Sequence, residues 1–140
     1  MIDSFRGKNY FLSNFYNADV KWEGITYHNN EAAFQSAKVL DMNIRREFGN
    51  ITNPSEAKRK GRKVKLREDW ESVKLDIMYQ IVKCKFIQNE KLKLKLLETN
   101  DEELVEGNNW HDTFWGCHNG YGQNNLGKIL MKVRDELRKE

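Results

Sequence analysis

The ten residues Asn29–Lys38, NNEAAFQSAK, decide the fold class because the pattern of the chain changes there from strand-like to helical. Just before them, VKWEGITY (residues 20–27) alternates apolar and polar side chains on both sides of a Glu23-Gly24 turn, which predicts a β-hairpin. The stretch itself begins with asparagine and an acidic residue, as helix N-termini do. We therefore expect a strand pair followed by a helix.

One face of this predicted helix carries reactive groups. Glu31, Gln35 and Lys38 recur at i, i+4 and i+7, which stacks a carboxylate, an amide and an amine with Phe34 beside them. A ladder of solvated side chains is one interpretation of this face. One wall of an active site is the other, and the polar turn YHNN (residues 27–30) after a predicted strand favours it.

The rest of the chain predicts further helices. In TNPSEAKR (residues 52–59), Asn53 is a plausible cap, with proline at the first helical position and Glu56 at the third. KLKLKLL (residues 91–97) alternates like a strand, but its lysine and leucine content and its flanks favour a helix. The longest predicted helix covers residues 67–88, and apolar side chains at steps of three or four give it a core-facing stripe: Trp70, Val73, Ile77, Ile81 and Cys84.

The chain closes with a predicted amphipathic helix within residues 124–140, whose apolar face carries Leu126, Ile129, Leu130, Val133 and Leu137. FLSNFY (residues 11–16) near the other end reads as a short strand or an extended loop with buried aromatic side chains. Together the patterns predict an α+β fold: one small, helix-rich domain over residues 1–140, with a short N-terminal aromatic β-sheet.

Composition places the chain among soluble globular proteins, with 39% hydrophobic and 32% charged residues in a length of 140. No apolar run approaches the roughly 20 residues of a membrane span, and the N-terminus lacks the apolar core of a signal peptide. Cys84 and Cys117 lie far apart, so we expect two free thiols and a cytoplasmic protein. The oligomeric state stays open.

A net charge of +3 is too small to indicate nucleic-acid binding by itself. The segment KRKGRKVKLR (Lys58–Arg67) nevertheless holds seven basic residues and no acidic one. A solvated basic segment and a contact surface for a phosphorylated or polyanionic ligand are both compatible with this run. A nucleic-acid-binding protein is one alternative, although the sequence shows neither a recognition helix nor an aromatic RNA-binding motif.

Residues 108–124, NNWHDTFWGCHNGYGQN, form an aromatic, glycine-rich stretch without a helical or strand period. Long loops of this kind within compact domains tend to be functional. The end of the stretch precedes a helix and can offer backbone N–H groups to an anion, but it lacks both common nucleotide-binding fingerprints. It is therefore a candidate pocket wall.

The same stretch contains His111, Asp112, Cys117 and His118 close together. Zinc sites show paired ligands at regular spacing with a second pair elsewhere, and only His28 is available to extend this set. We therefore expect no metal site. Nucleophilic catalysis by Cys117 with a neighbouring histidine would rest on a single pair of residues in one loop.

Five segments occur in order along the chain: FLSNFY, EAAFQSAK, GR…LREDW, LVEGNNWHDTFWG and GQNNLGKILMKVR. Together they resemble the NADAR (YbiA-like) family of N-glycosidases over nearly the whole chain, from Phe5 to Arg138. The resemblance implies hydrolysis of an N-glycosidic bond to a ribose that carries a phosphate or ADP. Implied substrates are the phosphorylated ribosylamino-pyrimidine intermediates of riboflavin biosynthesis, which would release ribose 5-phosphate, or ADP-ribosyl-guanine, which would release ADP-ribose.

By this resemblance, Glu31, Lys38 and Asp112 are predicted catalytic residues, without a metal or a cofactor. Arg6 and Arg62 are candidates for phosphate contacts. Predicted substrate contacts fall on Asn14, Gln35, Trp70, Glu106, Trp110, Trp115, Asn124 and Gly127. Cys117 and His118 depart from the acidic or glycine-rich continuation expected after the WG pair, which bears on substrate preference.

Cleavage of a ribosyl C–N bond builds positive charge on the sugar carbon, so a carboxylate such as Glu31 can stabilise that charge or orient water. Lys38 can instead attack C1 of the opened sugar and hold it as a Schiff base, for which burial must lower its pKa.

The tryptophans have two interpretations. Trp110 and Trp115 either stack on the base of the substrate or fill the hydrophobic core, and for Trp70 the core is favoured. A non-catalytic module that binds ADP-ribose or a nucleotide is the alternative function. The expected partner is a small phosphorylated riboside or ADP-ribosyl conjugate, with nucleic acid only as an ADP-ribosylated substrate and no membrane.

Overall fold

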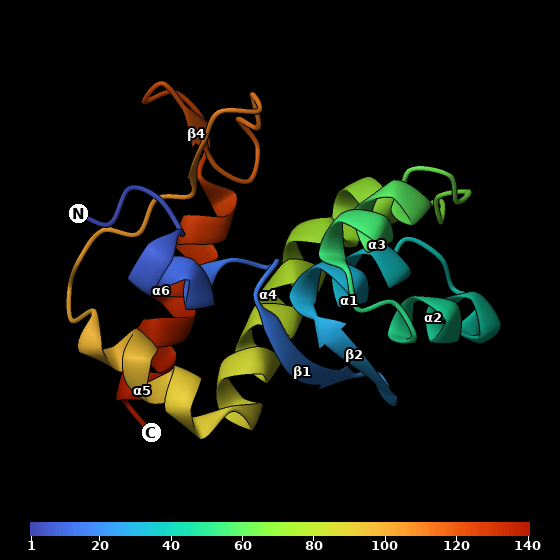
Figure 1. Ribbon diagram of the computed structural model, residues 1–140, viewed down its shortest axis with the longest axis horizontal. Coiled ribbons are helices and arrows are strands. Elements are labelled where there is room, and N and C mark those ends of the chain that lie inside the picture. Colours follow the sequence, from blue (N-terminus) through green and yellow to red (C-terminus); the bar gives the residue numbers. More distant parts are fainter. The chain divides into compact units, whose positions relative to one another are not determined.

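A computed structural model describes all 140 residues. The chain forms two compact units, one of residues Asn14–Asn89 and one of residues Met1–Ser13 with Glu90–Glu140. Helices dominate both units (Figure 1), and the strands form only two pairs. The predicted helix-rich α+β class is confirmed.

In the first of these units, β1 (Asn17–Trp22) and β2 (Ile25–Asn29) form the predicted antiparallel hairpin. The turn residues Glu23 and Gly24 have φ angles of 48° and 86°, the left-handed conformation that a tight two-residue hairpin turn requires at both positions. Val20, Trp22 and Tyr27 are buried against the helices, and the hairpin lies beside α1 and α4 (Figure 1). The aromatic sheet is therefore one wall of this unit's core.

Helix α1 (Asn30–Ser36) follows β2 without a loop. Asn29 caps it, because its side-chain oxygen accepts a hydrogen bond from Ala32 N at 2.8 Å. All seven helical residues are buried, so α1 is the central element of the unit. The helix is shorter than predicted: Lys38 lies in the turn after it, with its backbone N–H bonded to Gln35 O at 3.2 Å.

Helix α2 (Met42–Gly49) was not predicted from the sequence. Only Arg45 and Phe48 are buried on it, so it has no apolar stripe that a periodicity could reveal. Arg45 ties α2 to the hairpin, since its guanidinium donates to Glu23 Oε1 at 2.7 Å and to Val39 O at 2.9 Å. Helix α3 (Pro54–Gly61) begins as predicted, with the Asn53 side chain accepting from Ser55 N at 2.9 Å.

Helix α4 (Trp70–Gln88) begins three residues later than predicted. Arg67 and Asp69 form a bidentate ion pair at 2.6 and 3.1 Å in the turn that precedes it. The buried face is also wider than the predicted stripe. Val73 and Cys84 are only half-buried, and α4 buries Trp70, Ile77, Met78, Ile81, Val82, Lys85 and Phe86.

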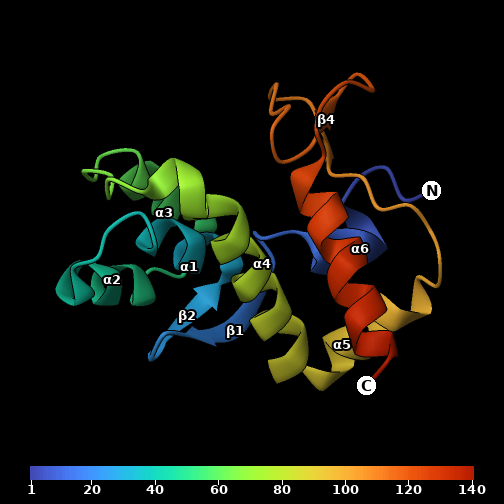
Figure 2. The same ribbon diagram turned by 180° about the vertical axis from the view of Figure 1, so that it is seen from behind.

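The second unit contains a 3-10 helix η1 (Gly7–Leu12), α5 (Glu90–Glu98), α6 (Asn125–Arg138) and two very short strands, β3 (Gly107–Asn108) and β4 (Cys117–His118). Helices α5 and α6 pack against each other (Figure 2). Both helices were predicted, and all five apolar residues assigned to the face of α6 are buried. The possible strand at FLSNFY is wrong, because Ser13 N bonds back to Tyr10 O at 2.9 Å and closes a helical turn there.

Asn124 anchors the start of α6. It adopts the left-handed conformation with φ 53°, which asparagine tolerates better than most residues. Its side chain accepts from Glu106 N at 2.9 Å and donates to Leu104 O at 2.9 Å. Gly127 lies against this amide, and a Cβ at position 127 would meet Asn124 and the Leu104 carbonyl. Asn124 and Gly127 therefore both contribute to the packing of this unit.

No helix in the structure combines the length and apolar character needed to cross a membrane. Cys84 in α4 and Cys117 in β4 are both free, as predicted.

Lys85 is the most deeply buried charged residue, with 1% of its surface exposed. Its amine lies over the rings of Tyr16 and Phe86, 5.6 and 5.2 Å from their centroids. Burial lowers the pKa of this amine from its usual 10.5 to about 7. The folded protein therefore carries a lysine that disfavours its charged form.

Replacement of Lys85 by methionine should stabilise the protein, and more at about pH 6 than at about pH 10. Between the folded pKa of about 7 and the usual 10.5, the unfolded chain binds more protons, so wild-type stability rises with pH in that window. This rise is at most about 1.4 kcal/mol per pH unit and should be missing in Lys85→Met. Urea denaturation across this range measures it, with the exposed Lys91→Met as control. Parallel pH profiles of wild type and Lys85→Met would contradict the prediction.

Replacement of Asn124 by alanine should lower the free energy of unfolding by about 2 kcal/mol, because one buried and one part-buried backbone group lose their partners and alanine is strained at a positive φ. Thermal or urea denaturation measures this loss. Asn109→Ala, an exposed change in the neighbouring loop, is the control and should stay within about 0.5 kcal/mol of wild type. A neutral Asn124→Ala would show that the amide does not hold α6 in place.

Candidate functional site

Glu31 and Gln35 form a buried pair on α1. Gln35 Nε2 donates a hydrogen bond to Glu31 Oε1 at 2.8 Å. Gln35 is 6% exposed and Glu31 is 8% exposed. An ionised carboxylate only accepts hydrogen bonds, so this contact also decides which end of the Gln35 amide faces Glu31. The interpretation of this face as a solvated ladder is therefore wrong.

Asn14 fixes the backbone beneath this pair. Its carbonyl accepts from Glu31 N at 3.0 Å, and its side chain accepts from Asn30 Nδ2 at 3.4 Å and donates to Met78 Sδ at 3.4 Å. These bonds tie the first turn of α1 to the segment that leads into the hairpin. Glu31 lies in that first turn, where the helix dipole favours a negative charge.

Lys38 approaches the same region from the turn after α1. Its Nζ donates to Gly61 O, at the end of α3, over a long 3.4 Å. Burial is the largest cause that lowers the pKa of this amine; Arg62 and Lys58 lower it further, and Glu31 raises it. More of the amine is thus neutral, and able to act as a nucleophile, than for an exposed lysine.

Trp70 stands at the start of α4 and packs on Phe34 of α1, with ring centroids 5.1 Å apart at an interplanar angle of 50°. Only 6% of Trp70 is exposed, so most of its ring belongs to the core of the unit. Arg62 follows α3 directly and is exposed, which leaves its guanidinium open to an anion. Its charge acts on Lys38, as described above.

The aromatic loop of the other unit is organised by Asn108, which sequence reasoning did not single out. Its Oδ1 accepts from Asp112 N at 3.0 Å, and its Nδ2 donates to Asp112 O at 2.8 Å and to Glu106 Oε2 at 3.2 Å. Its own carbonyl contacts His118 Nδ1 at 3.1 Å. Asparagine commonly organises turns in this way, and its place between Glu106 and Trp110 was the available signal.

Asp112 shapes the next turn of this loop. One carboxylate oxygen, Oδ1, accepts from Phe114 N at 3.0 Å and from Trp115 N at 2.9 Å. The Glu106 carboxylate lies where a Cβ on Gly116 would be, so a side chain at position 116 would displace it. Two of the predicted acidic site residues, Glu106 and Asp112, are thus held by one hydrogen-bonded loop.

The loop's aromatic residues differ in exposure. Trp110 is 50% exposed and free to stack on a planar ligand, whereas Trp115 is half-buried with an edge-to-face contact to Phe114 at 4.8 Å. Tyr121 is more exposed than either tryptophan. Arg6 precedes η1 in the same unit and is also exposed.

The rings of His111 and His118 in the loop are in tilted contact, with their centroids 4.1 Å apart and an interplanar angle of 44°. The structure brings no three His, Cys, Asp or Glu residues together as a group that could hold a metal ion. His28 belongs to the other unit, where it faces Asp19 at 3.7 Å. Cys117 places its thiol 3.7 Å from Gly122 O.

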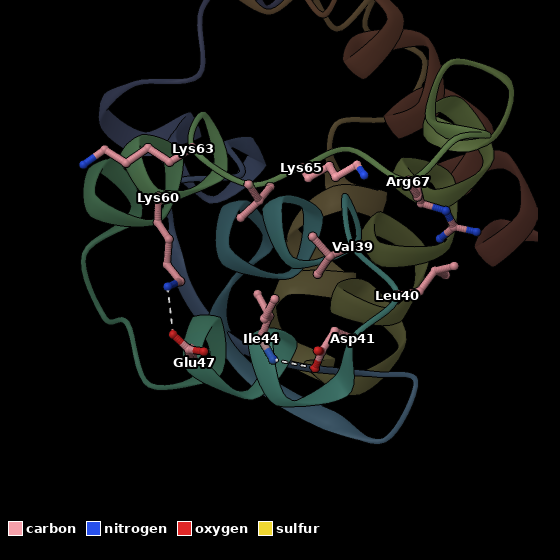
Figure 3. A pocket seen from close by; sticks show the side chains of 10 residues that line it. Val39, Leu40, Asp41, Ile44, Glu47, Lys60, Lys63, Lys65 and Arg67 are labelled. Carbon is pink, nitrogen blue, oxygen red and sulfur yellow. Dashed lines mark hydrogen bonds and ion pairs between the residues drawn. The ribbon is translucent and has the colours of Figure 1, made fainter.

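A cavity of about 590 Å³ opens beside α2 and the basic segment (Figure 3). Glu31, Gln35 and Lys38 do not line it. Two of its cations are already paired, Lys60 with Glu47 at 3.0 Å and Arg67 with Asp69. Its lining consists of Val39, Leu40, Asp41, Ile44, Glu47, Lys60, Lys63, Val64, Lys65 and Arg67. The candidate catalytic groups on α1 and in the turn after it therefore lie outside the lining of this cavity.

The predicted site residues thus form two groups. In one unit the structure brings together Glu31, Gln35 and Lys38, beside Gly61 of α3. In the other unit it brings Glu106 and Asp112 together around Asn108, with Asn124 bonded to the backbone of Glu106.

Comparison with known proteins agrees with the motifs. N-glycosidase YbiA of Shigella flexneri is 39% identical over 129 residues, which are 90% of this chain and 80% of that protein. A riboflavin biosynthesis protein of Vibrio vulnificus is 36% identical over 130 residues, which are 91% of this chain and 35% of that longer protein.

The fold agrees as well. The NMR structure of YbiA from Escherichia coli matches with a TM-score of 0.86 at 34% identity, covering 99% of this chain and 88% of that one. Residues 4–138 match the NADAR domain, so the match includes both units and every predicted site residue. The chain belongs to the NADAR family.

Proposed function

We propose that this chain is a cytoplasmic N-glycosidase that hydrolyses the bond between a phosphorylated or ADP-linked ribose and a nitrogen base. The observation that carries the proposal is the buried Glu31–Gln35 pair with Lys38 beside it. A carboxylate and an amine of lowered pKa in one place are groups that cleavage of a ribosyl C–N bond can use.

The reaction class follows from the relatives. The chain is a hydrolase of N-glycosyl bonds, because it is 39% identical over 90% of its length to a protein named an N-glycosidase. Such a relative also implies a small-molecule substrate. The finer assignment, of the substrate and of each residue's role, is our proposal.

Hydrolysis breaks the bond between C1 of the ribose and the base nitrogen, whose electron pair leaves with the base. Water supplies a hydroxyl group to C1 and a proton to the departing nitrogen. Positive charge develops at C1 on the way, and Glu31 is the group we assign to stabilise it or to orient the water. Gln35 supports this role because its amide holds the carboxylate in one orientation.

Lys38 offers a second route. Its neutral amine attacks C1 of the opened sugar, the base departs with a proton, and water then hydrolyses the Schiff base to return free sugar and amine. Burial, which lowers the pKa of Lys38, supports this route because a protonated amine cannot attack. Arg62, exposed beside this lysine, is the group that we assign to the substrate phosphate.

Two substrates fit this proposal: a ribosylamino-pyrimidine 5′-phosphate, and ADP-ribose attached to guanine. The name of the Vibrio vulnificus relative supports the first for that protein. In the other unit, the half-exposed ring of Trp110 is able to stack on a planar base. We also propose Asp112 as a catalytic residue, and Trp70, Trp115 and Arg6 as substrate contacts.

Glu31→Gln and Lys38→Met should each lower kcat by roughly 10²–10⁴-fold, the usual contribution of one acid–base group. The assay follows release of ribose 5-phosphate from the pyrimidine substrate and of ADP-ribose from ADP-ribosyl-guanosine. Glu56→Gln and Lys91→Met are matched changes at exposed positions and should retain activity.

Borohydride added during turnover separates the two routes. A ribose phosphate adduct on Lys38 assigns the Schiff-base route, and loss of activity in Glu31→Gln without any adduct assigns direct attack by water. A wild-type protein that releases no product from either substrate would overturn the enzyme assignment. Ligand-dependent stabilisation by about 2.7 kcal/mol at 100 times Kd, without turnover, would then indicate a binding module.

The pKa of Lys38 should respond to its neighbours in opposite directions. Glu31 raises this pKa and Arg62 lowers it, so Glu31→Gln should move it down and Arg62→Ala should move it up. Acylation of Lys38 followed by mass spectrometry over a range of pH reports both shifts without any substrate. Glu56→Gln serves as control, and shifts of the same sign in the two variants would show that another group governs the amine.

A further inference from the structure

We propose that Gly61 is a positioning residue for this reaction, which holds Glu31 through Gln35 and Lys38 through its own carbonyl. Gly61 is the last residue of α3 and is buried. The proposal rests on the proposed function, since it assigns a role in the chemistry of Glu31 and Lys38. Gly61 contacts Gln35, which donates a hydrogen bond to Glu31, and it also contacts the amine of Lys38, but it carries no reactive group itself.

The first contact is with Gln35. A Cβ at position 61 would lie 2.6 Å from Gln35 Cδ and 3.0 Å from Gln35 Cβ, and still closer to Oε1. Distances this short are repulsive, and the rest of the Gln35 side chain is buried, so the amide cannot swing into solvent. Any side chain at position 61 therefore forces Gln35 to move.

Movement of Gln35 would reach Glu31. The Gln35 amide donates through Nε2 to Glu31 Oε1 at 2.8 Å, while its Oε1 faces Gly61 and has no hydrogen-bond partner in the structure. Rotation of the amide would present Oε1 to the carboxylate, and two acceptors repel each other. The orientation of Glu31 thus depends on the space that glycine leaves.

The second contact is with Lys38, whose Nζ donates to Gly61 O at 3.4 Å. One residue of α3 therefore contacts the amide that orients Glu31 and accepts from the amine of Lys38. The two candidate catalytic groups are held relative to each other from the same point.

The backbone does not account for glycine at this position. Gly61 lies in a helix and has no left-handed φ, so alanine fits its conformation and has the higher helix propensity. A helix end without a neighbour would gain from alanine. The close approach of the Gln35 side chain is what disfavours it.

Gly61→Ala tests the inference, with Ser55→Ala as control because Ser55 is exposed in the same helix. The side-chain amide signal of Gln35, identified by its absence in Gln35→Ala, is followed by two-dimensional ¹⁵N NMR. We expect Gly61→Ala to shift this signal and to lower kcat by at least about tenfold, with KM changed by less than about threefold. Ser55→Ala should leave both the signal and kcat unchanged.

The double variant separates positioning from general damage. Gln35→Ala removes the side chain that a Cβ at position 61 would meet, so Gly61→Ala should change kcat by less than about twofold in that background. Where the activity of Gln35→Ala is too low to measure, the pH dependence of Lys38 acylation is compared with and without Gly61→Ala in the same two backgrounds. A profile that Gly61→Ala shifts by the same amount with and without Gln35 would overturn the link through Gln35.

Failure of this inference can be told from failure of the proposed function. An unchanged Gln35 signal in folded Gly61→Ala overturns the inference, whatever the activity, and so does an unchanged kcat despite a shifted signal. A wild-type protein inactive on both substrates overturns the proposed function, and Gly61 then has no reaction to position. Gly61→Ala that fails to fold, when Gly61→Ala with Gln35→Ala folds, still supports the contact between the two residues.

Discussion

The buried hydrogen bond from Gln35 to Glu31 is the contact on which the candidate site depends. A carboxylate removed from water needs hydrogen-bond donors, and here the neighbour one turn along α1 supplies one at 2.8 Å. Asn29 caps α1, and the hairpin, α2, α3 and α4 pack against it, so this bond lies away from water. It also requires α3 to approach without a side chain, which Gly61 allows. The candidate catalytic residues are thus also packing residues of this unit.

The charge of Lys38 is set by opposing effects in that setting. Burial and the neighbouring cations of the basic segment lower its pKa, and Glu31 opposes them. By composition, the basic segment Lys58–Arg67 resembles a solvated surface. Its charges nevertheless lower the pKa of the half-buried Lys38 amine. Part of the same segment is neutralised elsewhere, since Lys60 pairs with Glu47 and Arg67 with Asp69. Its effect on the site comes from individual positions, Lys58 and Arg62, and not from the run as a whole.

Local signals were sufficient for much of the fold. The Glu23-Gly24 turn, the Asn53 cap of α3 and the apolar face of α6 all follow from rules that act over a few residues. The strand alternative at FLSNFY was wrong, because apolar spacing does not distinguish a strand from a 3-10 turn, and prediction missed α2, which buries only two residues. Helix α4 starts three residues later than predicted, and the turn before it contains the Arg67–Asp69 ion pair, a contact that periodicity does not register.

By itself the sequence determined the fold class, the order of the family motifs and the choice of candidate catalytic residues, because residue type and spacing along one helix are local properties. Only the tertiary structure decided that Glu31 and Gln35 are buried, that Lys38 has a lowered pKa, and that Asn108 organises the aromatic loop. Gly61 and Gln35 are distant in sequence and meet because α3 packs on α1. Burial and close approach depend on which distant parts of the chain pack around a residue. A local sequence pattern does not contain that information.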